Sequence, residues 1–404
     1  MNTPNTQRRL CRAVWCPSMT ESIDEDGSVV WSFTKTGLVL LRSIGLMPFI
    51  KKKALSRILC KITFAHFLMS ALSQFSYLLF AEGKSFESVV PTILQLLIIS
   101  IIIAKSLIVI YRRKEIRELH FFWEDEKDLI NYSKMCVPEI KRVLFIYVLS
   151  LSISGSAWLF VPSVNHSAHQ EKGHTKMSQL PYLGWYPLNV ENEIYFYLLY
   201  VHQIIVLTLV GIASHGCKLL LLTLIVFVSK LLAYFNKKLR NVPKAENLTS
   251  SVEGCAKIKS KIQVFLQQIH GTFLKLAFLH LTELTIMFVI AAFRMTDPQN
   301  TFWQKVILMH GVSTQLLYFY LLCSYGSEII NQCHKGSNII YFWPWENWKL
   351  KDIEMMQMMA TINQRPLKLK AGLYTLSLEF FLTASGIAAT SFLLLINVRD
   401  HHIE

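Results

Sequence analysis

The sequence predicts an all-α integral membrane protein with seven transmembrane helices, a cytoplasmic N-terminus, an extracellular C-terminus and a helical cytoplasmic anchor. Three observations predict this class. Of the 404 residues, 52% are hydrophobic and 17% are charged, and the mean hydropathy of +0.36 is typical of membrane proteins. Apolar stretches recur at the roughly 20-residue length that crosses a bilayer. Basic residues alternate from one loop to the next.

Seven apolar stretches are long enough to span a membrane. They are residues 58–81, 88–111, 139–161, 194–217, 273–294, 306–324 and 371–397. A shorter stretch at 37–50, interrupted by Arg42, predicts an interfacial helix before the first span. Residues 1–28 are charged and have no apolar core, so we expect no cleavable signal peptide and assign insertion to the first span.

The distribution of positive charge predicts the orientation. Lysines and arginines number ten in residues 1–61, eight in 112–142, seven in 237–261 and six in 335–370, and the intervening loops hold six together. Because basic loops stay in the cytoplasm, the N-terminus is expected inside and the C-terminus outside. The sequon at Asn165 then lies outside and is the predicted glycosylation site, whereas the sequon at Asn247 lies inside.

The apolar run from Tyr195 to Tyr234 is too long for one membrane crossing and has no room for a helical hairpin. We interpret it as one long helix whose inner half, with Lys218 and Lys230, stands below the membrane. Amphipathic segments at 256–270, 327–341 and 347–364 have the same character and predict the anchor. The predicted domains are a cytoplasmic N-terminal segment 1–55, spans one to six in 56–324, the anchor 325–370, and the seventh span with its tail 371–404.

The sequence contains no catalytic or phosphate-binding motif, so we expect no enzyme activity and no cofactor. The basic residues that give the net charge of +14 lie beside membrane spans, and the sequence has no nucleic-acid-binding motif. We therefore expect no nucleic acid as a partner. Histidines of the outer loop 162–193 have uneven spacing and predict no metal site. Prolines in the same loop predict a loosely folded lid.

An ionisable residue inside a membrane span costs free energy, so each one calls for a structural or functional explanation. Lys105 lies close to Arg112, and we expect it to extend to the inner interface. His280 and Glu283 are three residues apart and share one helix face, which favours a polar contact between helices over ion binding.

The last span has a face that suits a pore. Ile387, Ser391, Leu394 and Val398 recur at helical spacing, and small residues at 384–389 permit close packing. If several copies surround an axis, this face lines a conduit narrowed at Leu394 and Val398. The alternative is that these residues face lipid or the protein core.

Polar and aromatic residues in the outer halves of four other spans predict a small, mostly apolar ligand pocket. An aromatic belt at the membrane interface is the alternative explanation for some of them. The predicted pocket residues are Thr92, Ile93, Ser154, Trp158, Tyr197, Tyr200, His310, Thr314 and Tyr318.

The chain resembles the insect odorant receptor family over essentially its whole length. The residues that carry the resemblance are Cys323, Ser324, Tyr325, Gly326, Glu328, Tyr341, Trp345, Arg365, Pro366, Leu367, Ala371, Gly372 and Phe381. The short loop 241–256 resembles ligand-tuned members, because the shared co-receptor carries a long insertion there. Most members have tyrosines where this chain has Ala389 and Ser391.

The resemblance implies an odorant-gated, non-selective cation channel. The chain would form a heterotetramer with co-receptor subunits in the plasma membrane of sensory neuron dendrites, in contact with lipid, permeant cations and a small hydrophobic volatile ligand. The family's pocket lies among spans two, three, four and six. Its hydrophobic gate falls on Leu394 and Val398, with Asn397 beside them.

Three other classes of membrane protein share part of this pattern. A gustatory-type chemoreceptor channel has the same architecture, but the usual Thr-Tyr and Gln-Phe pattern near the C-terminus is absent. A G-protein-coupled receptor needs the opposite orientation and usually an outer-loop disulfide, and all eight cysteines fall at cytoplasmic or membrane positions, where free thiols are expected. A transporter is disfavoured because no internal repeat is evident.

Overall fold

The computed structural model describes a helical bundle and one small hairpin. The described residues are 29–48, 53–80, 86–122, 145, 147–149, 180–188, 190–245, 247–295, 302–364, 366–372 and 374–400. The helices are α2 (Val29–Ser43), α3 (Lys53–Phe80), α4 (Phe86–Tyr111), α5 (Arg113–Phe121), α7 (Glu193–Asn241), α8 (Leu248–Met295), α9 (Phe302–Tyr341), α10 (Leu350–Asn363) and α11 (Leu378–Asp400). Short 3-10 turns at Val242–Lys244 and Trp345–Asn347, and the strands β1 (Lys370–Ala371) and β2 (Tyr374–Thr375), complete the described elements.

The predicted all-α membrane class is confirmed. Five helices in the described part of the chain, α3, α4, α7, α8 and α9, are long and apolar enough to cross a membrane, and α11 contains a shorter apolar stretch, Leu378–Thr390. The predicted third span, 139–161, lies outside the described residues except for helical turns at Phe145 and Tyr147–Leu149. The count of seven spans and the orientation of the termini therefore stay predictions.

Helix α7 is the single long helix that the sequence predicts. Its 49 residues correspond to about 74 Å at the usual helical rise. The side chain of Asn192 accepts a hydrogen bond from the backbone N–H of Ile194 at 2.9 Å and caps the start. Glu193 in the first turn and Lys238 and Arg240 in the last turn complement the helix dipole.

Helix α7 also forms the centre of the core. Every residue from Leu219 to Val228 is buried, so this part of the helix is covered on all sides. Helix α2 crosses it closely, because a Cβ atom on Gly37 would lie only 2.8 Å from the backbone nitrogen of Leu220. The helix predicted at 37–50 has other bounds, because α2 ends at Ser43, and its residues Leu38 and Leu41 are buried in the core. Its place at the membrane interface stays a prediction.

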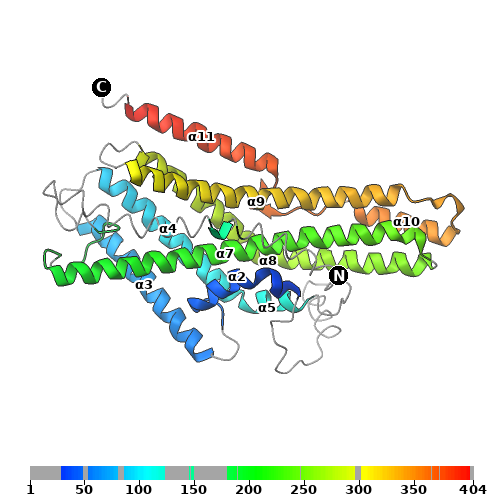
Figure 1. Ribbon diagram of the computed structural model, residues 1–404, viewed down its shortest axis with the longest axis horizontal. Coiled ribbons are helices and arrows are strands. Elements are labelled where there is room, and N and C mark those ends of the chain that lie inside the picture. The colour runs from blue at the N-terminus through cyan, green and yellow to red at the C-terminus, as the bar shows by residue number, and fades with distance from the viewer. Residues whose placement is uncertain are drawn as a thin grey trace, which may run out of the picture.

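Helices α7, α8 and α9 run along the long axis of the molecule (Figure 1). Helices α3, α4 and α11 lie toward one end, where α3 runs obliquely to α7, and α10 packs at the other end against α8 and α9. Polar contacts hold this second end: the amide nitrogen of Asn236 donates to the backbone oxygen of Gln332 at 2.8 Å, and Ser337 Oγ donates to the backbone oxygen of Asn363 at 2.9 Å.

The last helix begins later than the sequence predicts. Residues 370–375 form a two-stranded antiparallel hairpin that pairs Lys370 with Thr375, and α11 starts at Leu378. Gly372 adopts a φ of +64° in the turn, a conformation that favours glycine. The predicted start of the span at residue 371 is therefore wrong, because this glycine turns the chain into a hairpin before the helix begins.

One lysine outside the membrane-spanning segments is buried without a hydrogen bond. The side chain of Lys259 on α8 is fully buried, and its Nζ has no hydrogen-bond partner among the residues that the structure describes. The Nζ atom lies 5.4 Å from the centre of the Phe235 ring. Burial lowers the pKa of Lys259 from its ordinary value of 10.5.

We expect Lys259→Met to stabilise the protein by about 1–3 kcal/mol near neutral pH, because it removes an unsatisfied buried donor. Between the lowered pKa of the folded state and 10.5, the unfolded chain binds more protons, so wild-type stability rises with pH and the advantage of the variant shrinks. Thermal unfolding of the purified protein at pH 7 and pH 9 measures both effects. Lys257→Met, at an exposed position, is the control; a loss of stability in Lys259→Met alone would contradict this prediction.

Candidate ligand site, buried charge junction and terminal helix

The buried carboxylate of Glu283 on α8 contacts three residues on two other helices, α4 and α7. Lys218 Nζ on α7 donates to Glu283 Oε1 at 3.0 Å, and Lys105 on α4 forms an ion pair with Oε2. Ser214, one turn before Lys218, donates its hydroxyl to Oε1 at 2.9 Å. All four residues are buried. We call these residues, together with Gln315, the charge junction.

Gln315 brings a fourth helix into the charge junction. Lys218 Nζ also donates to Gln315 Oε1 on α9 at 2.6 Å. The ring of Tyr318, one turn further along α9, lies 6.0 Å from Lys218 Nζ and 5.6 Å from the ring of His280. The charge junction thus joins α4, α7, α8 and α9.

The charge junction corrects one prediction. Lys105 does not extend to the interface, because its side chain is 1% exposed and paired with Glu283. Lys218 is equally buried and shares the same carboxylate, and its predicted place below the membrane stays a prediction. His280 and Glu283 share one face as predicted, but their nearest N···O distance of 3.7 Å is too long for a hydrogen bond.

The predicted pocket residues occupy different surroundings. Thr92, Thr314 and Tyr318 are buried, His310 is half-buried, and Tyr200 packs beside Phe196 in a small cluster with Leu180 and Leu199. Ile93 and Tyr197 are 42% and 59% exposed. Ser154 and Trp158 lie outside the described residues, as does Asn165. Tyr318 therefore lies at the charge junction, and Tyr200 lies in the cluster with Phe196, Leu180 and Leu199. A pocket shared by all the predicted residues stays a prediction.

The end of the long outer loop is held against α3 and α7. The backbone N–H of Tyr182 donates to Gln203 Oε1, and Gln203 Nε2 donates back to the Tyr182 carbonyl, each at 3.0 Å. Ser70 Oγ on α3 donates to the Tyr182 hydroxyl at 2.9 Å. Burial raises the pKa of the Tyr182 hydroxyl. The prediction of a loosely folded lid over 162–193 is therefore wrong for residues 180–188.

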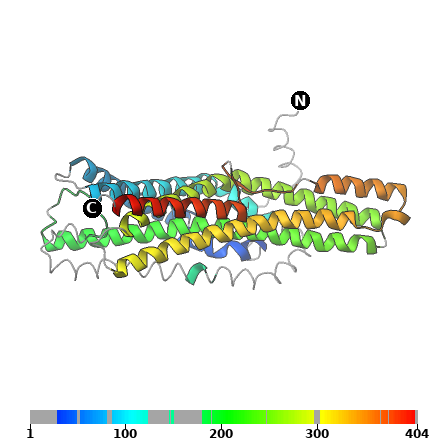
Figure 2. The same ribbon diagram turned by 90° about the horizontal axis from the view of Figure 1, so that it is seen from above.

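Helix α11 lies along the outside of the bundle (Figure 2). Near its start, Phe380 and Phe381 pack on Phe319 of α9 with ring centres 5.7 and 5.4 Å apart. Ile387 and Leu394 further along are each 63% exposed. The other predicted pore residues, Ser391, Asn397 and Val398, lie on the same helix. An exposed apolar face of this kind suits contact with lipid or with another subunit.

The start of α11 is fastened to α9 at a close backbone contact. A Cβ atom on Gly326 would lie 2.3 Å from the carbonyl oxygen of Leu376, so only glycine fits there. Beside it, the backbone N–H of Leu378 donates to Ser327 Oγ at 2.8 Å. Gly326 is among the residues that carry the family resemblance, and this contact gives it a physical role.

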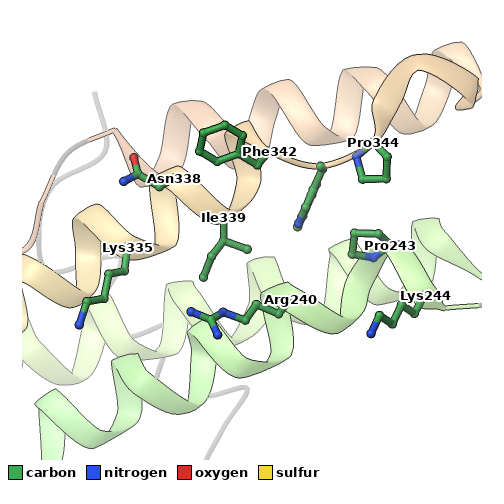
Figure 3. A pocket seen from close by; sticks show the side chains of 9 residues that line it. Arg240, Pro243, Lys244, Lys335, Asn338, Ile339, Phe342 and Pro344 are labelled. Atoms are coloured by element: carbon green, nitrogen blue, oxygen red, sulfur yellow. The ribbon is translucent and has the colours of Figure 1, made fainter.

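A basic cavity lies at the far end of α7, where the sequence predicts no site. It has a volume of about 490 Å³, and α7 contributes Arg240 while α9 contributes Lys335 and Ile339 (Figure 3). Pro243, Lys244, Asn338, Phe342, Trp343 and Pro344 complete the lining. Arg240 and Lys244 are close in sequence, and the distant Lys335 joins them because α9 runs beside the end of α7 (Figure 1).

These features define a class: a multi-pass helical membrane protein with a polar centre and an apolar terminal helix on the outside of the bundle (Figure 1). A family model described as 7tm Odorant receptor matches residues 86–387. The chain therefore belongs to the odorant receptor family, and the predicted resemblance is confirmed.

Solved structures share this fold. The insect olfactory receptor OR5 from Machilis hrabei in complex with eugenol aligns with a TM-score of 0.76 and 15% identity, over 91% of this chain and 98% of that chain. The same receptor in a second structure aligns with a TM-score of 0.75 and 15% identity, over 90% and 97% of the two chains. Comparison with curated protein sequences gives no match.

We expect Gly326→Ala to destabilise the protein by about 1–3 kcal/mol, because the added methyl group must push the backbone of Leu376 away. Gly271→Ala is the matched control, since a Cβ atom added there on α8 would have nothing within 4 Å and alanine favours a helix over glycine by about 1 kcal/mol. Thermal unfolding of both variants measures the difference. Equal stability of the two would contradict the close contact.

Proposed function

We propose that this chain is the odorant-binding subunit of a ligand-gated, non-selective cation channel, assembled with co-receptor subunits as a heterotetramer in the plasma membrane of sensory neuron dendrites. The observation that carries the proposal is the arrangement of α9 and α11 in an odorant receptor fold. Helix α9 carries Tyr318 in the buried centre and holds the start of α11 at Gly326 and Ser327. A change around Tyr318 therefore has a direct route to the terminal helix.

The ligand class is a small, largely apolar volatile molecule. The predicted pocket residues include the buried Tyr318 and Thr314 of α9 and Thr92 of α4, and they offer few polar groups within an apolar bundle. The hydroxyl of Tyr318 has no hydrogen-bond partner in the described part of the chain, which leaves it available to a polar group of a ligand. The olfactory receptor OR5 from Machilis hrabei, which shares this fold, has been solved in complex with eugenol.

The pore is assigned to the exposed apolar face of α11. Ile387 and Leu394 are exposed on this helix, and four copies around an axis would bring such faces together, with Leu394, Asn397 and Val398 at the narrowest part. Apolar constrictions gate by dewetting and discriminate little among cations. The basic loops support an inside N-terminus, an outside C-terminus and use of the Asn165 sequon. The packing of α10 on α8 and α9 supports the cytoplasmic anchor.

Membership of the odorant receptor family favours this function over the gustatory-type channel and the G-protein-coupled receptor. Electrophysiology separates these functions. Cells expressing this chain with a co-receptor are expected to give odour-evoked cation currents that persist when G-protein signalling is blocked, whereas the chain or the co-receptor alone gives a different odour profile or none. No odour-evoked current across a broad panel, or a current that requires G proteins, would contradict the proposal.

Two substitutions separate the pore from the pocket. Leu394→Ala shortens a side chain at the proposed constriction, so we expect a higher basal current or an altered conductance, with odour sensitivity within about twofold of wild type. Trp158→Ala is expected to raise the half-maximal odorant concentration by about tenfold or more, because it removes a large aromatic contact with the ligand. Conductance should stay the same. Single-channel recording measures both. A change of odour sensitivity in Leu394→Ala together with a change of conductance in Trp158→Ala would contradict the assignment of pore and pocket.

A further inference from the structure

We propose that Gln315 is a positioning residue: its hydrogen bond with Lys218 couples α9 to the charge junction and sets how readily the channel responds to odorant. This inference rests on the proposed channel function. It adds a control point at a residue that belongs neither to the predicted ligand contacts nor to the pore face, although Gln315 lies between Thr314 and Tyr318 on α9.

Lys218 bonds two helices through one ammonium group. Its Nζ lies 3.0 Å from Glu283 Oε1 on α8 and 2.6 Å from Gln315 Oε1 on α9. The Glu283 bond is an ion pair between fully buried groups, whereas Gln315 is half-buried and offers only a neutral amide oxygen. The ion pair has the Coulomb attraction between two charges, which the bond with a neutral amide lacks. The α9 side of the charge junction is therefore the weaker and more easily exchanged of the two.

The charge junction also carries an excess positive charge. Lys105 and Lys218 supply two positive charges, and Glu283 is the one carboxylate that contacts them in the described part of the chain. The amide of Gln315 thus stabilises a lysine whose counter-charge is shared with a second lysine. A carboxylate at position 315 would balance the charge and strengthen the link to α9, and an apolar side chain would remove the link.

Gln315 lies on α9 near the predicted pocket residue Tyr318, and the same helix holds the start of α11. It lies three residues before Tyr318, on the same helix face. In the other direction, Gly326 and Ser327 hold the start of α11 about 16 Å further along the same continuous helix. A shift or rotation of α9 that changes the Lys218–Gln315 distance would move the α11 attachment as well.

Two variants at one position test this role in opposite directions. Gln315→Glu strengthens the bond with Lys218, and Gln315→Leu removes it while keeping a similar volume. Ser313→Leu is the matched control, because it introduces the same side chain at an exposed position two residues earlier on α9. Each variant is expressed with the co-receptor. Surface delivery, the half-maximal odorant concentration and single-channel conductance are measured together.

We expect the half-maximal concentration to shift in opposite directions for Gln315→Glu and Gln315→Leu, each by about 3- to 10-fold, the range that one hydrogen bond supplies. Conductance and the Ser313→Leu response should equal those of wild type. A merely structural role would impair both Gln315 variants in the same direction.

Three results would overturn the inference: shifts of the same sign, unchanged sensitivity in both variants, or loss of surface delivery in either Gln315 variant with normal delivery of Ser313→Leu. Absence of odour-evoked current in the wild-type chain would instead overturn the channel function and this inference with it.

Discussion

A single buried carboxylate, Glu283, organises the packing of four helices. Lys218, Lys105 and Ser214 all bond to it, and Lys218 extends the contact to Gln315 on α9. Burying charges costs several kcal/mol each unless they are paired and hydrogen-bonded, and removing one partner of such a pair costs about 3–5 kcal/mol. The helices therefore cannot separate at this level without exposing an unpaired charge to an apolar interior. The apolar packing of α7 sets how close the helices come, and the charge junction sets which faces meet.

This constraint gives α9 a special position in the molecule. Tyr318 beside the charge junction and Gly326 at the start of α11 lie on one uninterrupted helix. A continuous helix moves largely as one body, so a displacement of α9 near Tyr318 also displaces the attachment of α11. Ile387 and Leu394 on α11 are exposed, which leaves this part of the helix surface available to other subunits. The fold thus combines a charged buried centre with an exposed apolar surface on its terminal helix.

Hydropathy and charge predicted the membrane class and the long α7 helix, because a bilayer demands helices of a given length and apolarity. The family resemblance followed from residues near the C-terminus. The contacts that set the centre of the bundle were beyond sequence reasoning. Lys105 and Glu283 are 178 residues apart; in the sequence, Lys105 looks like a charge that could reach the interface, and the helix partner of Glu283 cannot be identified. The hairpin before α11 and the burial of α2 likewise depend on close approaches at Gly372 and Gly37 that have no periodic signal.

The central claim is that Glu283 is ionised and bound to Lys218 inside the bundle. A double-mutant cycle measured by thermal unfolding of the purified receptor complex tests it most directly, with the variants Lys218→Met, Glu283→Gln and the two combined. Because Glu283→Gln leaves two buried lysines unpaired and the double variant leaves one, the account predicts that the double variant is more stable than Glu283→Gln alone. A double variant that loses the sum of the two single losses would show that the two residues do not interact, and would contradict the account.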